Sequence, residues 1–135
     1  MNGIENWFVL TDIFGDDFSF VNSQIECINS QPFAGNVWFD MIISSAVKKP
    51  PKKWNEWEKV YLRIDFFTAN ETYFNIVNSN EFIIRRCDVT NKEDRYNVTI
   101  EGVNGDVVKL DFWGARIQNV KPLVYNTKYN RYEVL

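Results

Sequence analysis

Histidine is absent from this sequence of 135 residues. Its absence removes the commonest general base and metal ligand of proteins, and with it every Ser-His-Asp or Cys-His arrangement. Only two cysteines are present, so a tetrahedral zinc site would have to be completed by carboxylates alone. No glycine-rich loop has the spacing that holds phosphates. We therefore expect no catalytic residues, no metal and no cofactor.

Cysteine, glycine and proline are scarce as well, with 2, 6 and 4 residues. These numbers argue against a disulfide framework, a linker or a low-complexity chain. Cys27 and Cys87 both lie in apolar, strand-like runs, so we expect two reduced and buried thiols. The N-terminal segment lacks a basic stretch followed by an apolar run, and no apolar run approaches the ~18 residues that cross a bilayer. We expect a cytoplasmic protein that does not enter a membrane.

Aromatic residues, in contrast, make up 16% of the chain. They favour pleated strands, and the length is that of one ordinary domain, so we expect a single β-rich domain over residues 1–135. Four segments alternate between apolar and polar residues, which places one strand face on a core and the other toward water. These segments are 36–47, 59–68, 81–89 and 95–101. Segment 18–29 is predicted to be another strand, with a bulge near Asn22.

The connections between these segments favour antiparallel pairing. Residues 32–35, 70–71, 78–80 and the Asn104-Gly105 pair are typical of turns, and no helix-length crossover separates two strands. A short helix is expected near the N-terminus, with an Asn2–Glu5 capping box at its start and Gly15 at its end. The predicted fold class is mainly β, an antiparallel sheet curled into a sandwich or open barrel, with one short N-terminal helix.

Paired carboxylates are the one enzymatic arrangement that the composition permits, as in glycoside hydrolysis. Asp16 and Asp17 are adjacent, but neighbouring side chains in a turn usually diverge. Asp65 and Asp111 each lie in an apolar strand, where burial would raise a carboxyl pKa. The alternation instead places both on the solvent side of half-buried strands. The sequence therefore gives little support to a hydrolase.

Charge is distributed unevenly along the chain. Residues 1–47 contain six acidic residues and no Lys or Arg, whereas the remaining residues hold the other 12 acids and all 15 bases. The first third is thus −6 and the rest +3, which gives the net charge of −3. A segment of one sign can steer a basic partner, although acids scattered on solvated turns would give the same numbers. Four of these acids, on or beside the expected helix, are candidate partner-binding residues: Glu5, Asp12, Asp16 and Asp17.

The loop 48–53, with the sequence KKPPKK, is followed at once by Trp54 and Trp57. Lysines next to aromatic residues are typical of single-stranded nucleic-acid sites, but the sequence pI near 5.0 argues against nucleic acid as the partner. A solvated hairpin tip, with the tryptophans turned back onto the sheet edge, explains the same residues. Exposed aromatic rings would instead form a platform for a partner, so Trp54 and Trp57 are added to the candidate partner-binding residues. Trp38, opposite the Val37/Phe39/Met41 face, either packs on a second face or is exposed as an interface anchor.

Several features follow one another along the chain in a recognisable order: Trp7, Phe14-Gly15, Asp16-Asp17, Ser19-Phe20, the loop with Pro50-Pro51 before Trp54, the segment from Asn75 to Phe82, and a closing strand pair whose last member reads DFWGARIQNVKPL. This order resembles the immunity protein 50 family of bacterial polymorphic toxin and contact-dependent inhibition systems. The resemblance covers most of residues 5–123. It departs from the family at Val21-Asn22, where the family tends to have a His-Asp pair.

The resemblance implies a non-enzymatic protein that neutralises a cognate bacterial toxin domain by binding and occluding it. Many such toxins are nucleases with basic substrate grooves, which an acidic first third would suit. A small carbohydrate- or peptide-binding β module of bacterial or phage origin, with Trp54 and Trp57 as its platform, is the alternative from another functional class.

Overall fold

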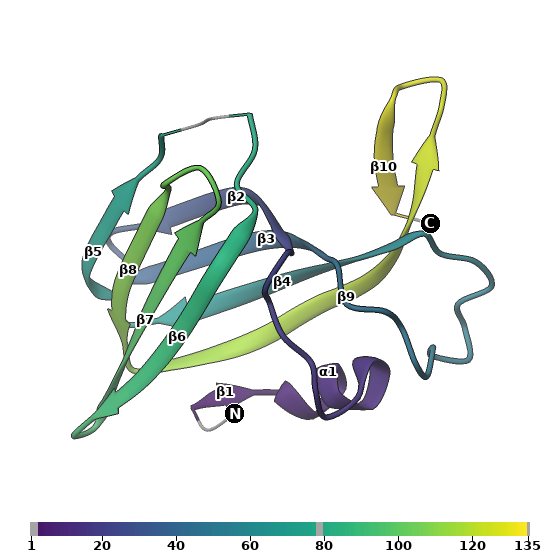
Figure 1. The fold of residues 1–135 in the computed structure, drawn as a ribbon. Helices are drawn as coiled ribbons and strands as arrows, with labels where there is room; N and C mark the ends of the chain where they lie inside the picture. Colours follow the sequence, from purple (N-terminus) through teal and green to yellow (C-terminus); the bar gives the residue numbers. More distant parts are fainter. Residues whose placement is uncertain (1–2, 78–79, 135) are drawn as a thin grey trace.

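The computed structural model describes residues 3–77 and 80–134, which form two β-sheets packed face to face and one short helix, α1 (Trp7–Phe14) (Figure 1). The predicted mainly β, sandwich-like fold is confirmed. The larger sheet contains, in spatial order, β1 (Ile4–Glu5), β9 (Gly114–Asn126), β4 (Lys59–Phe67), β3 (Asn36–Ile43) and β2 (Gln24–Gln31), with β10 (Arg131–Val134) paired to the far end of β9. The smaller sheet contains β5 (Asn70–Asn75), β8 (Val107–Phe112), β7 (Arg95–Gly102) and β6 (Ile84–Lys92).

The core forms where the alternation predicts it. The apolar positions on the inner face of β3 and β4 are all buried, and antiparallel register places Phe39 opposite Ile64 and Met41 opposite Leu62. The Phe66 ring lies 5.1 Å from that of Phe39 and 4.9 Å from that of Phe112, which belongs to the other sheet. Each such side chain contributes about 1.5–3 kcal/mol through burial. The two sheets are therefore joined by an aromatic centre.

The N-terminal helix is shorter than predicted and begins at Trp7. Ile4 is taken by the larger sheet, where β1 pairs with β9 in parallel, so the helix cannot start earlier. Asn6 precedes the helix with a left-handed φ of 64° and makes no side-chain cap, and Asn2 of the predicted capping box lies outside the described residues. The predicted stop is confirmed, because Gly15 has a φ of 94° and donates its N–H to the Thr11 carbonyl.

Segment 18–29 is a strand only from Gln24 onward, and the predicted bulge position is wrong. Asn22 lies in a turn with a φ of 71°, whereas the register of β2 shifts between Ile25 and Cys27. The preceding residues follow the helix instead. Phe18 and Phe20 pack edge-on against the Trp7 ring at 5.6 and 5.9 Å. Packing against α1 has replaced strand pairing there.

The turns at 32–35 and at Asn104-Gly105 are confirmed, because they join β2 to β3 and β7 to β8. Residues 70–71 are not a turn but the start of β5, whose register with β8 shifts between Asn70 and Tyr73. The turn predicted at 78–80 falls largely on residues 78–79, which are outside the described part. The segment DFWGARIQNVKPL, expected to be the last strand of a closing pair, is divided instead: Asp111 and Phe112 end β8, and β9 begins at Gly114 in the other sheet.

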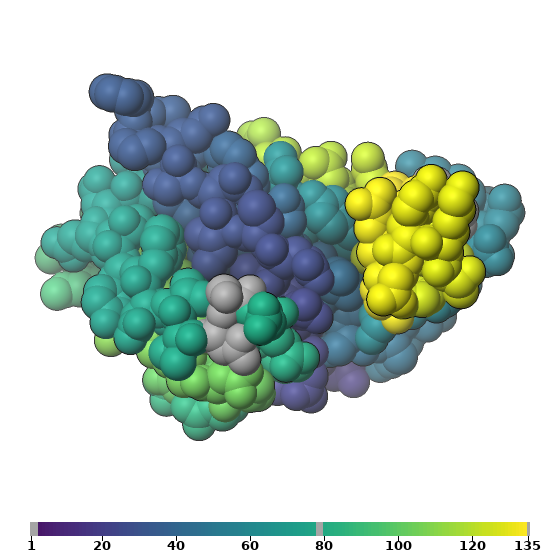
Figure 2. All heavy atoms as spheres, turned by 90° about the horizontal axis from the view of Figure 1, so that it is seen from above, coloured from purple at the N-terminus to yellow at the C-terminus, as the bar shows by residue number. Residues whose placement is uncertain are grey.

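Strand β9 is the longest in the fold, and its two ends have different partners. Its first part pairs with β4 as far as Leu123, and its last part, Leu123–Asn126, pairs with β10. We call residues 123–134 the C-terminal hairpin. Figure 2 shows it as a separate ridge at one end of the molecule. In Figure 1 its strand β10 lies on the side that faces β2 and β3.

Candidate functional site

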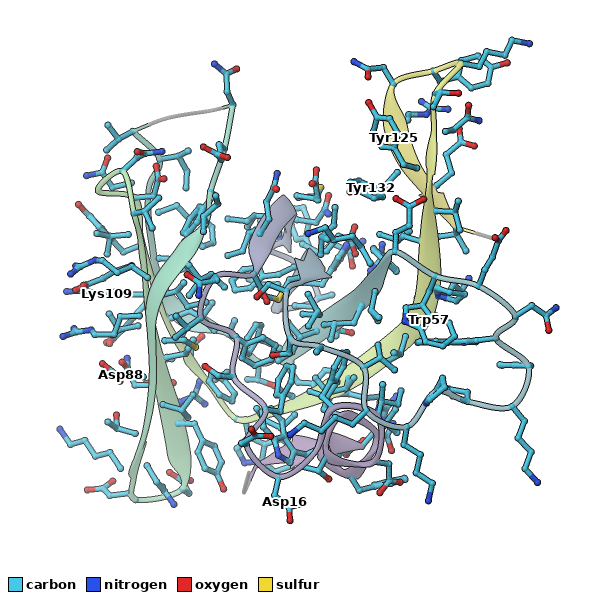
Figure 3. The ribbon with its side chains drawn as sticks, turned by 45° about the vertical axis from the view of Figure 1, so that its right-hand side comes forward. Asp16, Trp57, Asp88, Lys109, Tyr125 and Tyr132 are labelled. Carbon is cyan, nitrogen blue, oxygen red and sulfur yellow. The ribbon has the colours of Figure 1, made fainter. Side chains whose placement is uncertain are left out.

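The acidic residues predicted to bind a partner lie on or beside α1, as expected, but two of the four are already paired. Arg116 Nε lies 2.8 Å from Glu5 Oε2, and Lys48 Nζ lies 2.8 Å from Asp17 Oδ1. The hydrogen bond and charge of Lys48 lower the pKa of Asp17. Asp12 and Asp16 are exposed and form no ion pair within the described part of the chain; Asp16 points away from the molecule in Figure 3.

The lysine loop lies against the same helix. The backbone N–H groups of Lys48 and Lys49 both donate to the Ile13 carbonyl, at 2.9 and 3.0 Å. A shallow recess of about 410 Å³ lies between Asp12 and Val9 on one side and residues 49–52 on the other. The −6 segment and the KKPPKK loop are therefore neighbours, and the surface around α1 carries both signs.

The two tryptophans that follow the loop turn back toward the sheet. Trp54 is 7% exposed and belongs to the core cluster, while Trp57 is half-buried against that cluster, with the ring centroids 6.1 Å apart. Trp54 therefore leaves little of its ring for a partner. The same burial removes the open two-ring platform that a carbohydrate-binding module would use.

The carboxylates considered for hydrolysis are far from paired. Asp65 and Asp111 lie in different sheets, and Arg95 contacts Asp111 through both an ion pair and a hydrogen bond. Burial raises the pKa of Asp65, against the opposing influence of Arg116, Gln118 and Arg63. Among the residues placed by the structure, no three His, Cys, Asp or Glu side chains gather as a metal site would require. In the same residues, no helix is long and apolar enough to cross a membrane.

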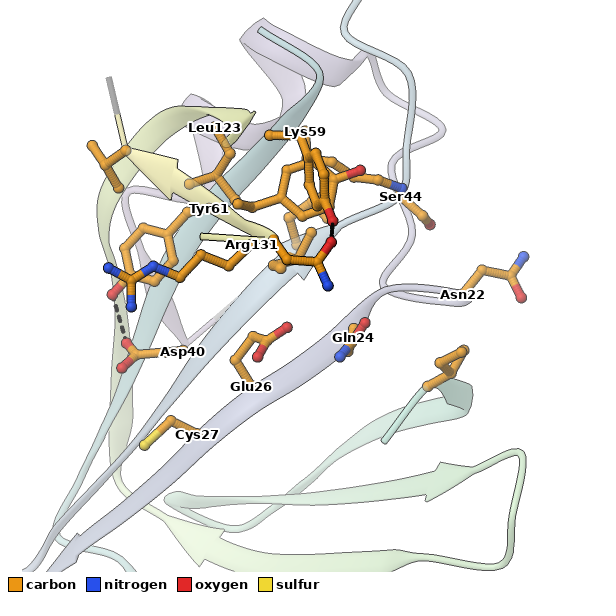
Figure 4. Close-up of a pocket in the computed structure, with 17 residues that line it drawn as sticks. Asn22, Gln24, Glu26, Cys27, Asp40, Ser44, Lys59, Tyr61, Leu123 and Arg131 are labelled. Carbon is orange, nitrogen blue, oxygen red and sulfur yellow. Dashed lines mark hydrogen bonds between the residues drawn. The ribbon is translucent and has the colours of Figure 1, made fainter. Parts of the chain in front are cut away.

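A larger recess lies between the outer face of β2, β3 and β4 and the C-terminal hairpin, with a volume of about 800 Å³ (Figure 4). We call it the hairpin groove. Its polar and aromatic lining includes Glu26 and Cys27 from β2, Asp40 from β3, Lys59 and Tyr61 from β4, and Tyr125, Asn130, Arg131 and Tyr132 from the hairpin.

The floor of the hairpin groove is fixed by a network around Asp40. Its carboxylate accepts hydrogen bonds from the Tyr61 hydroxyl at 2.7 Å and from Arg63 Nε and Nη2 at 2.7 and 3.2 Å. The Arg63 guanidinium also lies over the Trp38 ring, 5.4 Å from its centroid. Burial, together with the bond to Asp40, raises the pKa of Tyr61 to about 12. These side chains are therefore held in one arrangement before any partner arrives.

The wall of the groove is the C-terminal hairpin, in which the Tyr125 and Tyr132 rings meet edge to face at 5.2 Å (Figure 3). Glu58 ties the hairpin base to the body: it donates its N–H to the Leu123 carbonyl at 2.8 Å and accepts from the Tyr125 N–H at 3.3 Å. Opposite the wall, the bulge in β2 leaves Glu26 and Cys27 exposed in succession. The expectation that Cys27 is buried is wrong for this reason, whereas Cys87 is largely shielded.

The hairpin groove could not be predicted from the sequence. Of its lining, Glu26 and Asp40 entered the prediction only within the charge count of the first third, and Cys27 only as an expected buried thiol. The one available signal is the segment YNTKYNRY at 125–132, in which tyrosines flank turn-forming residues. That signal predicts a hairpin but not which surface of the sandwich lies beside it. The position of the hairpin depends on the change of partner along β9, from β4 to β10 at Leu123.

Comparison with known proteins gives one match. The family model described as Immunity protein 50 matches residues 6–123, which include α1 and all of the sandwich strands from β2 to β8. No curated protein and no solved structure matches the chain. The family match ends at Leu123, the first residue of the C-terminal hairpin. Because the match covers well over half of the sequence, the chain belongs to the Immunity protein 50 family.

Proposed function

We propose that this protein is an immunity protein that binds a cognate bacterial toxin domain and neutralises it by occlusion, without catalysis. The observation that carries the proposal is the family match over residues 6–123. An inhibitor of this kind needs a stable surface that is already in place, and the fixed outer face of the larger sheet supplies one.

We further propose a toxin with a basic surface, such as the substrate groove of a nuclease. Asp12 and Asp16 support this, because they are exposed carboxylates without ion pairs among the described residues. Exposed charges of this kind act mainly on the rate of association and lose their effect as salt rises. Glu5 and Asp17 would contribute less, since each already contacts a cation of the chain itself. Trp57 is half-buried against the core, so it would offer a partner only part of its ring.

The direct test is co-expression with a candidate toxin domain, taken from a neighbouring gene that encodes one. We expect the chain to co-purify with an inactivated toxin and to restore growth to cells that express the active one. A chain that neither binds nor protects would refute the proposal, whatever surface it was expected to use.

The role of the acidic surface is tested by Asp12→Lys combined with Asp16→Lys. We expect association to slow by at least ~10-fold at low salt, with an unchanged far-UV spectrum. The matched control is Glu93→Lys with Asp94→Lys, which changes the net charge equally in the exposed turn between β6 and β7. Equal slowing by both pairs would mean that net charge alone acts and that Asp12 and Asp16 have no special role.

A further inference from the structure

We propose that the hairpin groove holds an extended segment of the toxin, which pairs as an added strand with β10 and directs a basic side chain to Glu26. This inference rests on the proposed function. It assigns the strongest contacts with the toxin to the hairpin groove. It assigns the C-terminal hairpin to recognition.

The hairpin contributes little to the folded core. Beyond Leu123, none of the described hairpin residues is buried, and the Tyr129 side chain is 56% exposed. The family match also stops where the hairpin begins. A segment that projects from the sandwich without completing its core is free to serve a partner.

Strand β10 offers an open edge toward the groove. In the described chain it pairs with β9 alone, so the backbone N–H and C=O groups of its other edge have no strand partner. That edge is on the groove side, where Arg131, Tyr132 and Val134 line the recess. Its two charges do not block the approach of another strand, because Arg131 and Glu133 contact each other at 3.1 Å. An exposed edge of this kind is completed by an extended segment of another chain.

The side chains around this edge suit a protein segment. Tyr61, Tyr125 and Tyr132 bring large, rigid surfaces with a hydroxyl group, and Gln24, Ser44 and Asn130 add adaptable hydrogen-bonding groups. Tyrosine combined with small polar residues is typical of antibody surfaces that recognise proteins, because it provides contact area with few rotatable bonds.

The unpaired charges of the groove indicate which side chains the segment carries. Asp40 is neutralised by Arg63, and Arg131 by Glu133, but Glu26 has no ion pair with any described residue. The bulge between Ile25 and Cys27 keeps the Glu26 carboxylate outward. Lys59, at the start of β4, also lines the groove and has no ion pair with any described residue. We therefore expect a lysine or arginine of the toxin at Glu26 and an acidic or neutral residue near Lys59.

Binding measurements on the full-length chain and an inactivated toxin domain test this assignment. Glu26→Lys and Tyr132→Ala should each weaken Kd by at least ~10-fold, mainly through faster dissociation. The controls are Glu93→Lys, the same reversal on the smaller sheet, and Tyr129→Ala, the same truncation at a hairpin position outside the groove lining. Both controls should stay within ~3-fold of wild type.

Two further readouts address geometry and do not depend on substitutions. Toxin binding should slow hydrogen exchange at the amides of residues 131–134, because strand addition pairs the open edge. It should also slow maleimide labelling of Cys27, which lines the groove, but not the already slow labelling of shielded Cys87. If Tyr132→Ala weakens binding only by loosening the hairpin of the free protein, the result for Glu26→Lys is the decisive one, because Glu26 lies on β2, which does not pair with the hairpin.

The possible failures are distinct. If wild type binds and protects while both groove variants bind normally and Cys27 and the β10 amides are unaffected, the groove assignment is wrong and the proposed function stands. If an oligosaccharide shields Cys27 and these amides and the toxin does not, the occupant is wrong. If wild type binds no toxin, both proposals fall together.

Discussion

Asp40 lies in the middle of the outer face of the larger sheet, and its replacement by asparagine tests how that face is held together. The side chain is 16% exposed and accepts three hydrogen bonds, one from Tyr61 and two from Arg63. Burial alone would raise the pKa of Asp40, but the bonds from Arg63 and Tyr61 outweigh it and hold the pKa below its usual value. Asp40→Asn keeps the shape of the side chain and removes its charge.

The expected loss follows from the exposure of the partners. A hydrogen bond to a charged group contributes about 1.5–3 kcal/mol, and a partner left buried adds a desolvation penalty. Arg63 is 33% exposed, so water can reach its guanidinium in the variant and limit that penalty. We expect the free energy of unfolding to fall by about 2 kcal/mol. For a chain of this length the unfolding entropy is ~0.28 kcal/mol/K, so Tm should fall by about 7 °C.

The assay is urea unfolding combined with an alkaline titration of tyrosine absorbance. Burial raises the pKa of Tyr61 to about 12 in the folded protein, and Asp40 adds to this effect, so Tyr61 should ionise at a lower pH in Asp40→Asn, where the carboxylate is gone and burial remains. Because the pKa of Tyr61 is higher in the folded than in the unfolded chain, its contribution to the free energy of unfolding is fully present below pH ~10 and is lost as the pH rises toward 12. Wild type should therefore lose stability in that pH window. The control is Asp88→Asn, an exposed residue paired with Arg86. An Asp40→Asn variant within ~0.5 kcal/mol of wild type, with an unchanged Tyr61 titration, would refute the reasoning.

Three further outcomes are expected. Asp65→Asn should leave unfolding in urea unchanged or up to ~1 kcal/mol more stable at neutral pH, because burial raises the pKa of Asp65 and the charged form is disfavoured; a loss above ~1 kcal/mol would contradict this. Maleimide should label Cys27 quickly and Cys87 slowly, because burial raises the pKa of Cys87 to about 11; equal rates would count against it. Gly15→Ala should lower the free energy of unfolding by about 1–3 kcal/mol in thermal unfolding, more than Gly105→Ala does. Both glycines have a φ of +94°, but a Cβ at Gly15 would lie 3.1 Å from atoms of Asp17 and Lys48, whereas a Cβ at Gly105 would meet open space.

The core could be predicted because side-chain alternation is a local property. Val37, Phe39 and Met41 face one side of β3 whichever strand lies next to it, so the pattern reveals burial without knowledge of the partner. The Asn104-Gly105 turn is local in the same sense. Sheet membership is not local, which is why DFWGARIQNVKPL reads as one strand although Trp113 separates β8 from β9, which belong to different sheets.

Charge compensation could not be predicted for the same reason. The −6 count of the first third is correct, yet Asp17 meets a lysine 31 positions later and Glu5 an arginine 111 positions later. Such pairs depend on where the lysine loop and β9 come to lie. A count of charges along the chain therefore overstates the negative field around α1, and of the four candidate acids there only Asp12 and Asp16 have no ion pair among the described residues.

The acidic surface at α1 and the hairpin groove lie at opposite ends of the view in Figure 3, and the lysine loop contributes residues to recesses on both sides. Asp12 shares a recess with Lys52, and Lys53 shares the next one with Val134, which also borders the groove. A single toxin domain can therefore extend from the helix past the lysine loop to β10. Exposed carboxylates at one end and fixed aromatic side chains at the other would then act on different steps, the first on association and the second on dissociation. Salt should accordingly slow association of Tyr132→Ala as much as that of wild type, because this variant leaves every charge of the chain, including Asp12 and Asp16, unchanged.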